Sequence, residues 1–151
     1  MERSDARRTS SRARVMYLLP GENVTRQQEF FRAVASRDIV RVRVAAIVVS
    51  DGMILVQKPT DEPESCFAFI GGEYEVGDTL ESRITTEFEE ETTAIVTSCE
   101  YLFTVENRMR FEGKLLQAVE LYVAVTLDRS DVRSRESHLA QHWLPLARLL
   151  T

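Results

Sequence analysis

The stretch from Gly71 to Thr92, GGEYEVGDTLESRITTEFEEET, places the strongest constraint on what this chain can fold into. It holds eight carboxylates and a single arginine, Arg83. Like charges this close repel one another, so the segment must either expose them to water or give them a compensating cation. The two glycines at its start, Gly71 and Gly72, let the backbone approach another group closely, although a tight strand exit would also explain them.

A helix is predicted over most of this segment. Either Asp78 or Thr79 is suited to the N-cap, and the helix is expected to end near Thr93. Its buried stripe recurs at every fourth residue, at Leu80, Ile84 and Phe88. This spacing is typical of a helix with one face packed against the rest of the protein.

Three carboxylates belong to the side of this helix that is expected to face the protein. At about 100° per residue, Glu87 and Glu91 fall on the edge of the buried stripe, and Glu90 flanks it. Half-burying three like charges is costly without a cation, and clustered hard oxygen ligands suit Mg²⁺ or Mn²⁺. The pattern therefore predicts a divalent metal site, with a solvated acidic helix face as the alternative.

Strand signals flank the helix on both sides. Four segments are expected to form two hairpins, 39–50 with 53–59 and 94–107 with 115–127. The turns fall at Asp51-Gly52 and at residues 111–113. Between the hairpins, a polar loop over 59–66 precedes a short apolar strand over 67–72 that ends in two glycines.

The two ends of the chain are expected to differ. Residues 1–14 are basic and rich in serine, which predicts a flexible arm. Residues 15–38 form an N-terminal extension whose helix follows Thr25 as N-cap. Near the C-terminus, Pro145 is expected close to the start of a last short helix.

The composition is that of one ordinary globular domain. The chain has 151 residues, 44% of them hydrophobic, and contains no run of apolar residues long enough for a transmembrane helix. The net charge of −5 argues against a nucleic-acid partner. Cys66 and Cys99 lie in no metal-binding spacing, which favours reduced packing residues in a cytoplasmic protein, with a single disulfide left open.

The glycine pair and the acidic helix resemble the Nudix box, the signature of the Nudix hydrolase family, G-x5-E-x7-R-E-U-x-E-E-x-G-U with U a large aliphatic residue. The matching positions are Gly72, Asp78, Thr86, Glu87, Phe88, Glu90, Glu91, Thr93 and Ala94. The resemblance extends over roughly residues 39–150, including YLFTVEN and the closing WLPL. It implies an α/β fold, a Nudix-type α/β/α sandwich with a mixed β-sheet over residues 39–151, preceded by the N-terminal helical extension.

The resemblance also implies an activity. Nudix hydrolases cleave a nucleoside diphosphate linked to another group, by attack of water on the pyrophosphate with Mg²⁺ as cofactor and Mn²⁺ as a substitute. Glu90 and Glu91 correspond to the principal metal ligands, and Glu87 to a ligand or water-orienting base, so all three are catalytic candidates. The carbonyl of Gly72 corresponds to a further metal ligand.

Substrate contacts are implied for a second set of residues. The predicted substrate-binding residues are Lys58, Phe69 and Gly71. Lys58, at the end of a strand, and Phe69, before the glycines, stand where the family often contacts substrate, although plain structural roles are equally compatible with the sequence. The expected partner is a nucleotide-like small molecule. Pairing of sheet edges or apolar helix faces would also allow a homodimer.

The chain departs from the family pattern near the site. Thr86 replaces the arginine that would hold and orient Glu87, and Thr93 replaces the glycine after the helix. Gln117-Ala118 stands where a His-Glu pair is common. Three acidic residues are candidate substitutes, namely Glu106, Glu120 and Glu136. The departures motivate an alternative function, a Nudix-fold nucleotide-binding or regulatory module with little or no hydrolysis.

Overall fold

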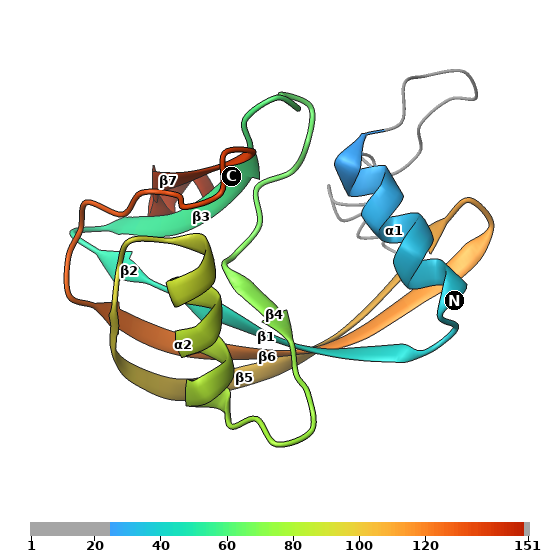
Figure 1. Ribbon diagram of the computed structural model, residues 1–151, viewed down its shortest axis with the longest axis horizontal. Coiled ribbons are helices and arrows are strands. Elements are labelled where there is room, and N and C mark those ends of the chain that lie inside the picture. The colour runs from blue at the N-terminus through green and yellow to red at the C-terminus, as the bar shows by residue number, and fades with distance from the viewer. Residues whose placement is uncertain (1–24, 150–151) are drawn as a thin grey trace, which may run out of the picture.

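The computed structural model describes residues 25–149, so the arm predicted over residues 1–14 lies outside the described part of the chain. Two sheets and two α-helices make up its architecture (Figure 1). The larger sheet has the strand order β4-β1-β6-β5, with β4 at Gly71–Glu73, β1 at Val40–Ile47, β6 at Lys114–Leu127 and β5 at Val96–Phe111. The smaller sheet has the order β2-β3-β7, with β2 at Val49–Ser50, β3 at Met53–Pro59 and β7 at Leu139–Pro145.

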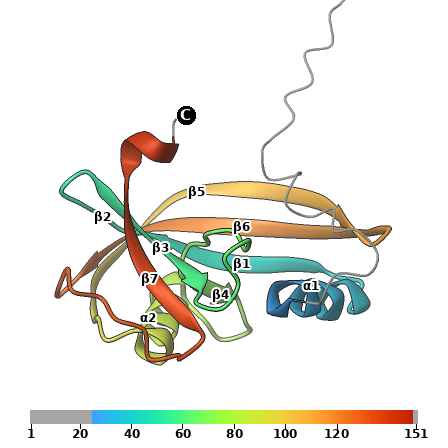
Figure 2. The same cartoon turned by 90° about the horizontal axis from the view of Figure 1, so that it is seen from above.

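The larger sheet is mixed. Strand β1 runs parallel to β6 and antiparallel to β4, while β5 and β6 form a long antiparallel hairpin. In Figure 2, β5, β6 and β1 run side by side, and β3 and β7 cross them at the end away from α1, which spans Arg26–Ser36. The expected α/β class with a mixed sheet is confirmed.

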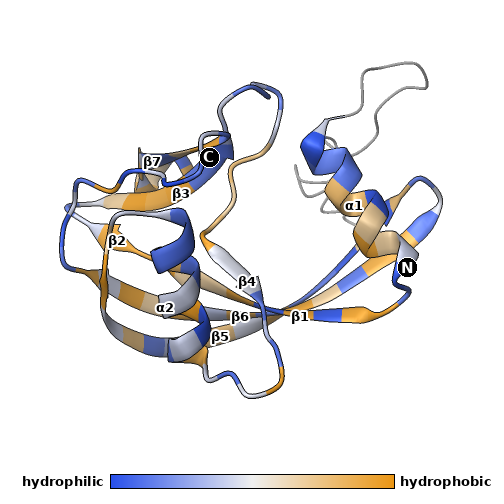
Figure 3. Cartoon of the chain, viewed as in Figure 1, coloured by the Kyte–Doolittle hydropathy of each residue, from blue (hydrophilic) through white to orange (hydrophobic). Residues whose placement is uncertain are grey.

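The main core lies between the sheets and α2, which spans Leu80–Glu91. Ile84 and Phe88 are fully buried, as the stripe predicted, and Leu80 is partly buried against the same core. The strand residues of this core are Val44, Ala46, Leu55, Val123 and Val125. Figure 3 shows hydrophobic segments along β5 and β6 beside α2.

The helix α1 covers the opposite face of the larger sheet. Its Thr25 N-cap is confirmed, because the Thr25 side chain accepts a hydrogen bond from the backbone of Gln28. Val34 packs against Leu116 of β6. Leu116 is an odd number of residues from Val123 of the main core, so its side chain points to the other face of the sheet. The two helices therefore lie on either side of the sheet, as expected of an α/β/α sandwich.

The first predicted hairpin is only partly correct. Residues 40–47 leave the predicted pairing and enter the larger sheet, and only β2 pairs with β3 across the turn. The reason is that both edges of β1 are occupied, by β4 and by β6. The turn itself is as predicted, with φ of 51° at Asp51 and 72° at Gly52, the left-handed pair that tight hairpins favour.

Three smaller boundaries also moved. The apolar strand expected over 67–72 begins only at Gly71, since Ala68 forms no more than an isolated bridge with Gln57. The second hairpin is longer than expected, and its turn at Glu112-Gly113 has positive φ at both residues. The last predicted helix is a 3₁₀ turn, Leu146–Leu149, that follows Pro145. Within residues 25–149, no helix is long and apolar enough to cross a membrane.

Candidate functional site

Glu87 is a buried carboxylate held against the glycine pair. An added Cβ at Gly72 would lie 1.9 Å from Glu87 Oε1, so only a glycine leaves room for this side chain. The φ of Gly72 is not positive, which makes space the reason for the glycine there. Burial raises the pKa of Glu87, and the hydrogen bond from Arg83 opposes that rise.

Glu91 lies one turn further along the same face of α2. Its Oε2 accepts a hydrogen bond of 3.1 Å from Gln57 Nε2 of β3, which ties the helix to the smaller sheet. Burial raises the pKa of Glu91 to about 7. The hydrogen bond from Gln57 opposes that rise, whereas the negative charges of Glu87 and Glu136 contribute to it, because like charges disfavour another ionised carboxylate.

Glu90 differs from its two neighbours. The sequence predicted that it faces the protein, but its side chain is exposed, although its charge still acts on Glu87 and Glu91. The prediction was wrong because a residue at the flank of a helical stripe is covered only if a neighbouring element reaches it. In the described part of the chain, moreover, no three Asp, Glu, His or Cys side chains are gathered closely enough to hold a metal ion.

The donor chemistry nevertheless fits a hard divalent cation. Glu87 is buried and Glu91 is partly buried, and both have raised pKa values, so the burial of these oxygen donors is not fully compensated even with Arg83 beside Glu87. The residues that would hold such an ion are Glu87 and Glu91, with the exposed Glu90 as a further candidate. The Gly72 carbonyl remains a predicted further ligand.

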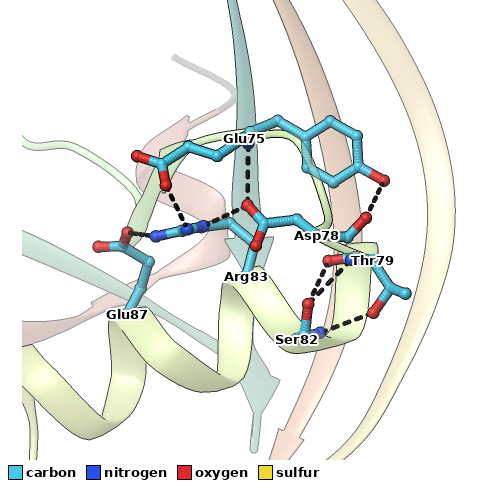
Figure 4. Close-up of polar contacts among 7 residues, drawn as sticks. Glu75, Asp78, Thr79, Ser82, Arg83 and Glu87 are labelled. Carbon is cyan, nitrogen blue, oxygen red and sulfur yellow. Dashed lines mark hydrogen bonds and ion pairs between the residues drawn. The ribbon is translucent and has the colours of Figure 1, made fainter.

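Arg83 lies at the centre of the carboxylates around the start of α2 (Figure 4). It donates from Nε to Asp78 Oδ2 at 2.8 Å and from Nη1 to Glu87 Oε1 at 3.3 Å. A third contact, 3.3 Å from Nη2 to Glu75 Oε2, reaches the preceding loop. The Arg83 hydrogen bond holds the pKa of Asp78 below its usual value.

The two ends of α2 show which residue is the N-cap and whether Thr93 needs a left-handed conformation. Thr79 is the N-cap, in a capping box with Ser82, which leaves Asp78 free to pair with Arg83. At the other end, the chain leaves α2 in an extended conformation at Thr92, with φ of −135°. No left-handed residue follows the helix, so Thr93 in place of glycine brings no backbone strain.

The predicted substrate residues have different surroundings. Lys58 donates to the carbonyl of Pro63 and lies 5.1 Å from the ring centroid of Phe67, so it holds the 59–66 loop. Phe69 instead meets Tyr122 edge-on, at 5.9 Å between ring centroids. Gly71 is packed against β1, since an added Cβ would lie 2.1 Å from the carbonyl oxygen of Val44.

Sequence reasoning missed two aromatic residues beside Phe69. Tyr122 of β6 stacks on Phe103 of β5, with centroids 5.0 Å apart and an interplanar angle of 27°. Phe103 remains 46% exposed. The alternation of β6 could have placed Tyr122 on the α1 face, but only the strand register brings it next to Phe103. These three rings are called the aromatic row below.

The candidate substitute acids are scattered. Glu106 is exposed and pairs with Arg108, while Glu120 is buried and bonded to Arg43, Asn107 and Tyr122. Among the three candidates, Glu136 is the one whose charge acts on Glu91. Gln117 and Ala118 line a cavity of about 40 Å³ beneath α1. A larger cavity of about 300 Å³ lies near Trp143 and contains no carboxylate of α2.

Known structures provide a likeness that sequence comparison does not. No protein-family model matches the chain, and no curated protein is significantly similar to it. A MutT Nudix hydrolase from Burkholderia pseudomallei superposes with a TM-score of 0.61 at 25% identity, over 73% of this chain and 86% of that one. A MutT protein from Bacillus halodurans gives a TM-score of 0.57 at 20% identity, covering 74% of this chain and 72% of that one.

A third likeness is to the Nudix domain of Shewanella oneidensis NrtR, a structure complexed with ADP-ribose. Its TM-score is 0.57 at 18% identity, over 84% of this chain and 87% of that domain. The shared architecture agrees with the glycine pair, the acidic helix and the mixed sheet of this chain. The resemblance seen in the sequence is thereby confirmed, and the chain has the fold of the Nudix hydrolase family.

Proposed function

We propose that the chain is a divalent-metal-dependent Nudix-type hydrolase that cleaves the pyrophosphate of a nucleoside diphosphate derivative. The observation that carries this proposal is a pair of carboxylates on one face of α2 beside Gly72, of which Glu87 is buried and Glu91 is partly buried. A solvated acidic helix face would leave both carboxylates in water with ordinary pKa values.

The residues divide the work of hydrolysis as follows. When bound, Mg²⁺ neutralises phosphate charge and makes a water molecule more acidic. Glu87 and Glu91 would hold the cation, with the exposed Glu90 as a further candidate ligand. A bound cation would favour the ionised carboxylate of Glu91, which suits this residue to a ligand role and leaves Glu87 as the ligand or water-orienting base. Gly72 keeps the space beside Glu87 open for these groups.

The aromatic row supports a nucleotide-like substrate. Ala45 of β1 pairs with Gly71 on one side and with Tyr122 on the other, so Tyr122 lies two strands, or about 10 Å, from the glycine pair. Because β4 is the edge strand of the larger sheet, a ligand with its pyrophosphate near Gly72, beside α2, would pass round this edge to place its base near Phe103 on the α1 face. The NrtR domain, which was crystallised with ADP-ribose, has the same fold.

Replacing Phe103 with alanine tests the aromatic row. Since stacking of a base on an aromatic ring is worth about 1–3 kcal/mol, Phe103→Ala is expected to raise KM roughly 5- to 160-fold with little change in kcat. Leu115→Ala, at a residue 52% exposed on the same hairpin, is the control and should leave KM unchanged. An unchanged KM in Phe103→Ala would show that the substrate base does not stack on Phe103.

The function itself is tested by coupled phosphate release from nucleoside triphosphates, ADP-ribose, sugar nucleotides, dinucleoside polyphosphates and NADH. Each substrate is assayed with EDTA, Mg²⁺ or Mn²⁺, and melting is followed in parallel. Metal at 100 times its dissociation constant should stabilise the fold by about 2.7 kcal/mol, or roughly 5–10 °C in Tm. Metal-dependent turnover of one class supports the enzyme and names its substrate.

A binding or regulatory module is the second candidate. It is favoured by the exposure of Glu90 and by the absence of a gathered set of metal ligands in the described residues. Its expected result is nucleotide binding in calorimetry with no product across the panel. Multiple turnovers with metal would exclude it. A melting temperature that changes with neither metal nor nucleotide would contradict both functions.

A further inference from the structure

We propose that Arg83 is the positioning residue of the carboxylate site, supplying from one helical turn earlier the cation that the Nudix box places at position 86. The proposal rests on the proposed function and deepens it. It states which residue of this chain holds Glu87 in place, now that Thr86 occupies the usual arginine position.

Helical geometry explains why position 83 serves this purpose. Residues 83 and 87 are four apart, so their side chains lie on the same face of α2 one turn from each other. The side chain of Arg83 is largely covered, at 14% exposure, and that of Glu87 is 11% exposed. The contact is therefore shielded from water and is not one of the exposed ion pairs that contribute little.

The three donors of Arg83 reach three carboxylates from different parts of the chain. Asp78 precedes the helix, Glu87 lies within it, and Glu75 belongs to the loop after β4. A planar guanidinium fixes the directions of its N–H groups, which a lysine ammonium does not. Arg83 therefore fixes Glu87 relative to the loop that follows Gly72.

Glu87 is restrained from two sides. Its Oε1 accepts from Arg83 and also lies where a side chain at Gly72 would be, so this oxygen is enclosed. Because both of these contacts fall on Oε1, Oε2 would be the oxygen of Glu87 that is available to a cation. Loss of Arg83 would free the carboxylate to rotate and would remove the positive charge that offsets its burial.

The capping of α2 does not depend on Arg83. The N-terminus keeps the reciprocal hydrogen bonds of Thr79 and Ser82, so a variant at position 83 is expected to fold. This separation allows metal affinity and stability to be measured independently.

The test is calorimetric Mn²⁺ titration of the full chain with Arg83→Gln, beside melting of the metal-free protein. Loss of a residue that orients a ligand typically costs 10- to 100-fold in metal affinity, and we expect a loss in that range. The control is Arg108→Gln, whose pair with Glu106 is exposed on β5, and it should bind Mn²⁺ as the wild type does. Wild-type affinity in folded Arg83→Gln, even with a lower Tm, would overturn the proposal.

Two further variants keep the test decisive. Arg83→Lys retains the positive charge but not the planar, forked N–H geometry of the guanidinium. It should fold and bind Mn²⁺ at least 10-fold more weakly than the wild type. The double variant Arg83→Gln/Thr86→Arg restores a cation at the box position and should recover most of the lost affinity. Wild-type affinity in Arg83→Lys, or no recovery in the double variant, would count against the proposal.

The outcomes for Arg83 and for hydrolysis are distinguishable. Wild-type protein that binds Mn²⁺ but turns over no substrate would contradict the hydrolase while leaving the Arg83 comparison intact. Normal affinity in the Arg83 variants of an active enzyme would contradict the positioning role alone. Wild-type protein that binds no Mn²⁺ would overturn both.

Discussion

Glu91→Gln is expected to lower turnover at least about 100-fold while leaving the fold intact, because it removes a metal oxygen and keeps the shape of the side chain. Gln57 can still hydrogen bond the new amide after its own amide rotates, which preserves the tie between α2 and β3. The measurement is kcat/KM with saturating Mg²⁺ on the substrate identified from the panel. Glu89→Gln, at an exposed position of the same helix, is the matched control and should retain full activity.

The same variant should stabilise the metal-free protein at high pH. The folded pKa of Glu91 is raised from 4.5 to about 7, so the folded state binds the proton more tightly than the unfolded state does. Stability therefore falls as the pH rises from about 4.5 to about 7 and stays lower above that range. Removing the charge should recover roughly 2 kcal/mol, or about 5 °C in Tm, at pH 8 and almost nothing at pH 4.

These two effects have opposite signs, which makes the variant informative. A protein that loses turnover because it unfolds would show a lower Tm, whereas Glu91→Gln should lose turnover and gain Tm in the presence of EDTA. Undiminished turnover would remove Glu91 from the active site. If the wild type and Glu91→Gln showed the same dependence of Tm on pH, the carboxylate of Glu91 would be well solvated in the folded protein.

The glycine pair should separate catalysis from folding. At Gly72, an added Cβ meets the flexible end of Glu87, at 1.9 Å from Oε1 and 2.4 Å from Cδ. Gly72→Ala should therefore displace that carboxylate and lower metal affinity and turnover by about 100-fold, with a Tm loss of only a few degrees. Calorimetry with Mn²⁺ and melting curves measure the two effects.

Gly71→Ala should mainly lower the stability of the fold, in contrast to Gly72→Ala. Its Cβ would lie 2.1 Å from the carbonyl oxygen of Val44 and 2.8 Å from the Cα of Ala45, and backbone atoms in a paired strand cannot step aside. We expect a destabilisation of about 3 kcal/mol or more, roughly 10 °C in Tm, from separation of β4 and β1. Equal losses of stability in the two alanine variants would contradict the different surroundings of the two glycines.

The local features of the chain were readable from spacing alone. The stripe at Ile84 and Phe88 predicted α2, and the Asp51-Gly52 pair predicted its turn, because helix and turn signals depend on residues close in sequence. The need for glycine at 71 and 72 followed from the same reasoning, although the groups that approach them were unknown.

The sequence predicted the placement of the acidic residues of α2 only in part. A helical stripe predicts which side of α2 faces inward, and Glu87 and Glu91 do so. It does not predict how far neighbouring elements extend, and for this reason Glu90 is exposed and Gln57 is the partner of Glu91.

By itself, the sequence determined a glycine pair before an acidic amphipathic helix, and with it the resemblance to the Nudix hydrolases. Only the tertiary structure decided that β1 leaves its hairpin for the larger sheet, that Phe69, Tyr122 and Phe103 form one row, and that Arg83 holds Glu87. The physical reason is the range of the interactions. Helical periodicity and turn chemistry act over a few residues, whereas strand register and side-chain ion pairs depend on how distant segments come together.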